Sequence, residues 1–179
     1  MADVSYTPED LLRLTLATWI FRLSQAGVAP EDGPMGDLCT GVACAEDAKT
    51  GDELGWALVA RVGELLGDAD GKPDAMRALA TTLYGDRVSF DLGGGTRDAR
   101  TTRIRRYQFG RALPWLARIW ERSPEGSVGP VWLLVEQVTD QVIAMDPNPW
   151  NDIDEERRLP FEDFQVLWEL DACSSLHIR

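Results

Sequence analysis

The sequence predicts an α+β domain in which a mainly helical half, residues 1–85, precedes a small antiparallel sheet. Apolar residues recur at the helical spacing of three or four residues in the first half. After it, two apolar runs joined by a tight turn occupy residues 131–146, as in a β-hairpin. A length of 179 residues with 44% hydrophobic content suffices for one core. We therefore expect a single domain over residues 1–179, with three or four strands covered by two short helices.

Local signals place four helices in the helical half. The first begins at Thr7-Pro8, because threonine caps a helix and proline suits its first turn, and it ends before Gly27. Further helices start at Asp52 and Asp74 and end at glycines. The expected helices span residues 8–26, 38–48, 52–67 and 74–84, and residues 28–36 are expected to form a loop.

The second half mixes strands and helices. Val88 to Leu92 alternates as a half-buried strand does, and the next expected strands are residues 131–138 and 141–146, with a turn at Thr139-Asp140. Apolar residues at helical spacing predict helices at 113–122 and 160–170. Loops are expected at 123–129 and 147–152, a solvent-facing charged stretch at 154–158, and an edge strand or irregular chain at 172–179.

Charge is distributed unevenly along the chain. The formal net charge is -12, yet residues 97–122 contain eight of the sixteen arginines and only two carboxylates, Asp98 and Glu121. This segment, the arginine stretch, therefore carries about +6 and the rest of the chain about -18. Such segregation predicts either a charged binding face or a pair of complementary patches within the molecule.

The composition argues against several classes of protein. Overall acidity opposes general binding to nucleic acid or to an anionic membrane. No apolar run approaches the roughly 20 residues that span a bilayer, and Met1 to Thr7 has no basic region followed by an apolar one. Three cysteines without metal-type spacing and a single histidine predict reduced thiols and no metal site. We expect a cytoplasmic protein with no membrane segment, metal or cofactor.

Residues 130–168 resemble a known family. Trp132 to Val135, the turn, Val142 to Pro147 and the segment Phe161 to Trp168 are similar to the strand pair, Asp-Pro step and Phe-x-x-x-Trp helix of papain-like, bacteriocin-processing cysteine peptidases. The resemblance implies a related fold.

The resemblance also implies site positions. Asp146 matches the acidic residue that orients the catalytic histidine, and Cys39 or Cys44, near the start of an expected helix, would stand where the nucleophile belongs. The position of the catalytic histidine itself is occupied by Val131. The resemblance therefore implies a relative without activity, because a thiol needs an activating base at neutral pH.

Three interpretations of the arginine stretch remain open. The arginines pair with the chain's own acidic loops, at Glu31-Asp32 or at 152–156; or they contact an acidic surface on a partner or on a second copy of the chain; or they bind single-stranded nucleic acid. The third interpretation rests on the aromatic residues that interleave with the arginines, which are Tyr107, Phe109, Trp115 and Trp120.

We favour the second interpretation. It describes a non-catalytic interaction or assembly subunit of a larger intracellular bacterial complex, which docks through the arginine stretch and the loop at 147–154. Trp150 in that loop is either an interface anchor or a lid over the sheet. The alternatives are an inactive papain-like relative and a nucleic-acid-associated protein. The residues expected to bind are Arg100, Arg103, Arg105, Arg106, Arg111 and Trp150.

Overall fold

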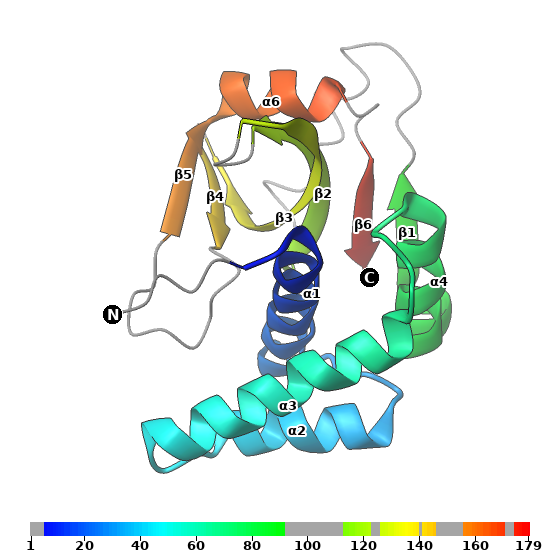
Figure 1. The fold of residues 1–179 in the computed structure, drawn as a ribbon, viewed down its shortest axis with the longest axis vertical. Helices are drawn as coiled ribbons and strands as arrows, with labels where there is room; N and C mark the ends of the chain where they lie inside the picture. Colours follow the sequence, from blue (N-terminus) through cyan, green and yellow to red (C-terminus); the bar gives the residue numbers. More distant parts are fainter. Residues whose placement is uncertain (1–5, 92–112, 123–125, 140, 146–155, 171–173) are drawn as a thin grey trace.

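The computed structural model describes residues 6–91, 113–122, 126–139, 141–145, 156–170 and 174–179. In these ranges the chain forms five α-helices, one short 3-10 helix and a six-stranded antiparallel sheet (Figure 1). Four of the five α-helices precede the first strand. The α+β class predicted from the sequence is confirmed.

The helical half contains α1 (Pro8–Gln25), α2 (Gly33–Ala43), α3 (Ala48–Leu66) and α4 (Pro73–Tyr84). Thr7 Oγ1 accepts a hydrogen bond from Asp10 N at 3.1 Å, while the Asp10 carboxylate accepts one from Thr7 N at 3.0 Å. This reciprocal pair satisfies two backbone donors at the start of α1. The positive φ of +59° at Gly67 ends α3, as the sequence predicted.

Two helix starts differ from the prediction because aspartates cap them. Asp32 accepts from Met35 N at 2.9 Å, so α2 starts at Gly33 and the predicted loop at 28–36 is shorter than expected. Asp47 accepts from Thr50 N at 2.8 Å, so α3 starts four residues before Asp52. An aspartate that bonds the third backbone N–H after it fixes a helix start more strongly than apolar spacing does.

The sheet has the strand order β1-β6-β2-β3-β4-β5. The predicted hairpin of β3 and β4 and the predicted strand β1 are confirmed, and α6 (Phe161–Glu169) forms where a helix was expected. The strands are β1 (Val88–Asp91), β2 (Trp115–Arg122), β3 (Val128–Val138), β4 (Gln141–Met145), β5 (Glu156–Pro160) and β6 (Ser175–Ile178).

The helix predicted at 113–122 is wrong, because this segment forms β2. Its apolar residues fit helical spacing, but alternate residues of β2 are buried on opposite faces of the sheet. Trp115 and Ile119 point to one face and Leu116 to the other, and β2 pairs with both β3 and β6. Burial on two faces favours a central strand, whereas a surface helix buries only one side.

Two further strands depart from the prediction. The charged segment expected to be solvent-facing contains β5, which pairs with β4 at the edge of the sheet. β6 is an internal strand, because it lies between β1 and β2 and pairs with both. The sheet therefore has six strands where three or four were expected.

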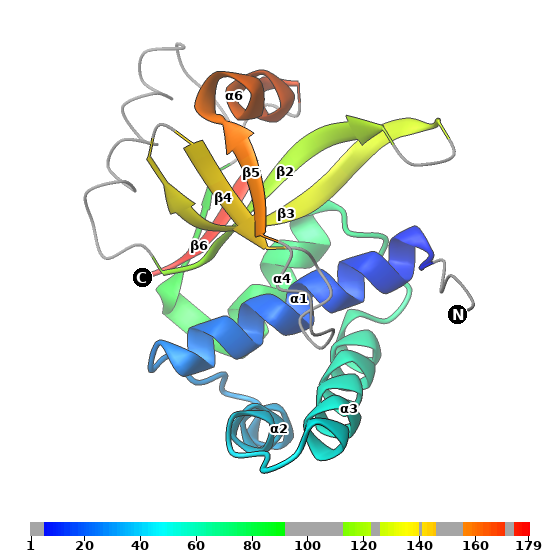
Figure 2. The ribbon, with the colours of Figure 1, turned by 90° about the vertical axis from the view of Figure 1, so that its left-hand side faces the viewer.

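Helices cover both faces of the sheet (Figure 2). On one face, α1 contacts β3 and α4 contacts β1. On the other, α6 buries Phe164 and Trp168 against Trp115 and Leu133. α2 and α3 form an outer layer on the far side of α1 from the sheet (Figure 2), and α2 packs mainly against α1 and α3.

The sheet is strongly curved. Arg157 of β5 forms an ion pair with Glu121 of β2, although β3 and β4 separate these two strands in the sheet order. α6 contacts β2, β4 and β5, so it lies across the concave face of the sheet (Figure 1). The second apolar cluster fills the space between α6 and the sheet.

Candidate functional site

The residues predicted to bind lie outside the described residues. These are Arg100, Arg103, Arg105, Arg106, Arg111 and Trp150. Asp146, which the papain-like resemblance implied as an orienting residue, lies outside them too.

The described end of the arginine stretch is β2. Arg118 is partly buried in β2 opposite Trp132, and Arg122 is exposed at the end of the strand. Trp115, one of the aromatics considered for base stacking, is buried, with its ring centroid 6.3 Å from that of Phe164 and 6.0 Å from that of Trp168. Trp115 therefore belongs to the core and is unavailable to a nucleic acid.

The cysteine positions implied by the papain-like resemblance do not agree with the helix boundaries. Cys39 lies in the middle of α2 and Cys44 caps its C-terminal end, whereas the resemblance placed a nucleophile near a helix start. Cys39 is buried, and this burial raises the pKa of its thiol to about 11. A thiol with this pKa is almost entirely protonated at neutral pH, so Cys39 is a core residue rather than a nucleophile.

Sequence reasoning missed a buried serine-histidine pair in β6. Ser175 Oγ and His177 Nε2 are 3.0 Å apart, and the His177 ring stacks on Trp115 with a centroid distance of 4.7 Å. Residues two apart on a strand point to the same face, so the Ser-x-His spacing was the available signal once a strand was assigned.

This pair has the composition of a nucleophile and base but not their accessibility. Ser175 is 1% and His177 7% exposed. Burial lowers the pKa of His177 to about 3, so the imidazole resists taking up the proton that a general base must accept. The two side chains therefore satisfy each other's hydrogen-bonding groups inside the core. We expect the pair to contribute to the stability of the fold.

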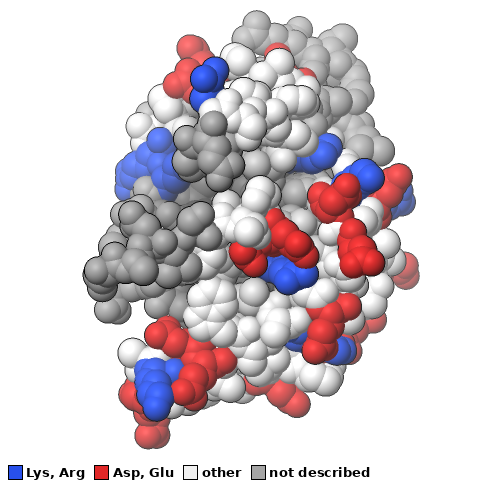
Figure 3. All heavy atoms as spheres, viewed as in Figure 1, with Lys and Arg blue, Asp and Glu red and all other residues white. Residues whose placement is uncertain are grey.

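An acidic surface covers the outer layer of helices. Residues 31–70 contain ten carboxylates against Lys49 and Arg61, a net charge of -8. Figure 3 shows acidic side chains in excess over the lower part of the view, where α2 and α3 lie. We define the acidic face by five carboxylates of α2, α3 and the turn between them, which are Asp37, Glu46, Asp47, Asp52 and Glu53.

The fold neutralises this face only slightly. Lys49 lies 3.9 Å from the Glu53 carboxylate, and both side chains are largely exposed. Exposed pairs of this kind contribute little. Within the residues that the structure describes, the carboxylates of Asp37, Glu46 and Asp52 form no ion pair. The side chains of Asp37 and Glu46 are exposed to solvent, and that of Asp52 is partly exposed.

An exposed aromatic residue lies beside these acids. Trp56 of α3 is 43% exposed and stacks on Tyr6, with a centroid distance of 6.3 Å and an interplanar angle of 28°. Asp52 and Glu53 precede Trp56 by four and three residues, so all three side chains lie on the same side of α3. Carboxylates beside an aromatic face are a chemical match for a guanidinium group.

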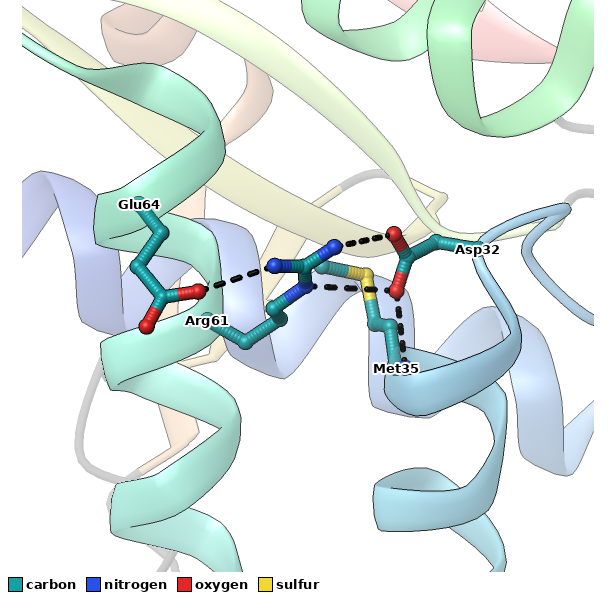
Figure 4. Close-up of polar contacts among 4 residues, drawn as sticks. All are labelled: Asp32, Met35, Arg61 and Glu64. Carbon is teal, nitrogen blue, oxygen red and sulfur yellow. Dashed lines mark hydrogen bonds and ion pairs between the residues drawn. The ribbon is translucent and has the colours of Figure 1, made fainter.

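Asp32 is already occupied by an arginine of the helical half (Figure 4). Arg61 donates to its two carboxylate oxygens, from Nη2 at 2.7 Å and from Nε at 3.3 Å, and Arg61 Nη1 donates to Glu64 at 2.8 Å. The bonds from Arg61 hold the pKa of Asp32 below its ordinary value. This network ties the start of α2 to α3, so Asp32 is a poor internal partner for the arginine stretch.

Loss of the Asp32 side chain should destabilise the protein. Asp32→Ala is expected to lower the free energy of unfolding by about 1–2 kcal/mol, because it removes both the cap of α2 and the partner of Arg61. Asp32→Asn should cost less, since its amide oxygen still accepts from Met35 N. Urea unfolding followed by circular dichroism measures both. Equal losses for the two variants would assign the whole effect to the ion pair instead of the cap.

Across the described ranges, no three His, Cys, Asp or Glu side chains are grouped as metal ligands would be. No helix in these ranges has both the length and the apolar character needed to cross a bilayer. The chain matched no protein-family model, no curated protein and no solved structure.

Proposed function

We propose that this chain is a non-catalytic interaction or assembly subunit of a larger intracellular bacterial complex, and that it docks through the arginine stretch. The observation that carries the proposal is the separation of charge, with about +6 in residues 97–122 and -8 in residues 31–70. Complementary charge on two surfaces steers association and selects partners. Trp150 is proposed as an apolar anchor beside the arginines.

The chemistry of the described residues supports a binding role over a catalytic one. His177 is the only histidine of the chain and is buried, and Cys39 is buried in α2. Cys44 is exposed, but the sole imidazole of the chain, that of His177, is enclosed in the core on β6. A nucleophile and a base must reach each other and the substrate, and these groups do not.

The acidic loop at Glu31-Asp32 offers little to the arginine stretch. Asp32 is paired with Arg61, and in the described part of the chain Glu31 takes part in no ion pair. The second acidic loop, at 152–156, falls almost entirely outside the described residues. The Glu31-Asp32 loop therefore supports outward docking over internal pairing at that loop.

Reversing three arginines tests this function. The Arg103→Glu, Arg105→Glu, Arg106→Glu variant is expected to lose association while its melting temperature stays within a few degrees, because outward-facing charges contribute little to stability, about 0–1 kcal/mol each. Size-exclusion chromatography with light scattering, at low and high salt, measures association, and circular dichroism measures melting.

The matched control reverses three exposed basic residues that precede the arginine stretch, Lys72, Arg77 and Arg87, to glutamate. This control carries the same change in net charge and should still associate. A large loss of stability in the arginine-stretch variant would contradict docking and indicate internal pairing. A gel shift at low salt that disappears in that variant would indicate nucleic acid as the partner instead.

A further inference from the structure

We propose that the acidic face of α2 and α3 is the docking site for the arginine stretch of a second copy of this chain. The inference rests on the proposed function and names its partner. Each molecule then carries both the arginine stretch and the acidic face that binds it. Contacts between copies are therefore head-to-tail and build a ring or a filament.

Charge complementarity is the first argument. The acidic face belongs to a segment with a net charge of -8, and the arginine stretch carries about +6. Among the described residues, Asp37, Glu46 and Asp52 have no ion-pair partner within their own molecule. Asp37 and Glu46 are exposed and Asp52 is partly exposed, so an arginine-bearing segment can neutralise charge that the molecule's own ion pairs leave uncompensated.

The layering of the fold is the second argument. β1 precedes the arginine stretch and β2 forms its end, and both strands belong to the sheet. α1 lies between the sheet and the layer of α2 and α3 (Figure 2). The acidic face therefore lies on the far side of α1 from the strands that flank the arginine stretch in the sequence, where it is accessible to a neighbouring molecule.

The chemistry around Trp56 is the third argument. Its indole is 43% exposed and is held by the stack on Tyr6. A guanidinium group stacks on an indole face and at the same time donates two hydrogen bonds to a carboxylate, a combination that lysine does not match. Asp52 and Glu53 supply carboxylates on the same side of α3. The arginine stretch contains no lysine, in keeping with such a site.

Charge reversal on each surface tests the inference. The Asp52→Lys, Glu53→Lys variant is expected to weaken self-association by at least about tenfold relative to the native chain at low salt. The Arg103→Glu, Arg105→Glu, Arg106→Glu variant should do the same. Sedimentation velocity over a concentration series, in about 50 mM and about 500 mM salt, gives the association constants, and high salt should weaken the native contact.

Mixing the two variants identifies the pairing. Each variant alone lacks one of the two surfaces, but the acidic-face variant keeps its arginines and the arginine variant keeps its acidic face. Their mixture should form a 1:1 complex that grows no further.

A control and a milder variant exclude indirect effects. Glu162→Lys, Asp163→Lys reverses an adjacent acidic pair at the start of α6, on the other face of the sheet, and should leave association unchanged. Asp52→Asn, Glu53→Gln removes the charge with little change of shape, and should weaken association even if the lysine variant folds poorly. Circular dichroism confirms folding in each case.

Three results would overturn the inference. If the acidic-face variants associate as the native chain does while the arginine variant does not, the docking site lies elsewhere and the proposed function stands. If the native chain remains monomeric at its highest soluble concentration in low salt, self-docking is wrong, and the proposed function then depends on another partner. If the arginine variant instead loses stability, the proposed function fails with it.

Discussion

Replacing Trp19 with alanine is expected to lower the free energy of unfolding by about 3–5 kcal/mol. Trp19 is 1% exposed and lies between α1 and the sheet. Its Nε1 donates to Pro114 O, just before β2, at 2.8 Å, and its ring contacts Tyr84 edge-on at a centroid distance of 5.9 Å. Truncation removes a large buried surface and leaves the carbonyl of Pro114 without this donor. A loss of this size is a large part of the stability of an ordinary domain.

The chain contains a matched control for this variant. Trp56→Ala removes the same side chain from the surface of α3 and is expected to cost less than about 1 kcal/mol. Trp19→Phe keeps most of the apolar volume but loses the hydrogen bond, so its effect should fall between the two. Urea unfolding monitored by circular dichroism at neutral pH compares them. Similar losses for Trp19→Ala and Trp56→Ala would contradict the assignment of Trp19 to the core.

The free energy of unfolding is expected to fall steeply as the pH drops below 6.5, because His177 is buried in its neutral form. The folded protein holds His177 neutral with a pKa of about 3, against an ordinary value of 6.5. Between these values the unfolded chain binds one more proton than the folded one, so acid favours unfolding. The contribution of His177 is complete above about pH 6.5 and declines by about 1.4 kcal/mol per pH unit toward the folded pKa, or about 2.7 kcal/mol by pH 4.5.

The His177→Gln variant separates this effect from other titrations. It should lose most of the slope of unfolding free energy against pH between pH 5 and 6.5, even if it is less stable than the native chain at every pH. Carboxyl groups such as Asp10 and Asp47 have pKa values held below their ordinary range by hydrogen bonds from Thr7 and Thr50, so they contribute at lower pH. Because the chain has no other histidine, an unchanged slope in the variant would show that His177 is not held neutral.

The helices were predictable because their signals are local. Thr7 with Asp10 marks the start of α1 within a few residues, and Gly67 marks the end of α3. β2 was not predictable in the same way. Leu116, Ile119 and Trp120 satisfy helical spacing, and only the pairing with β3 and β6, which are distant in the sequence, selects the strand.

The candidate site was predictable in part. Counting charges along the chain reveals both the arginine stretch and the acidic segment at 31–70. The fold decides which carboxylates remain available to bind arginines. Asp32, for example, already forms an ion pair with Arg61 of α3. Neither the approach of Arg157 to Glu121 nor the enclosure of Ser175 and His177 has a local signal, since both follow from the curvature and pairing of the whole sheet.

The position of β6 bears on how the chain folds. β2, β3 and β4 are joined by neighbouring pairings, but β1 meets them only through β6, and Arg87 Nε donates to the carbonyl of Arg179, 92 positions away. Bringing such distant segments together costs conformational entropy before any contact compensates for it. The helical half and the hairpins can therefore form early and separately. We therefore expect the insertion of β6, four residues long, between β1 and β2 to be the slow step that joins them in one sheet.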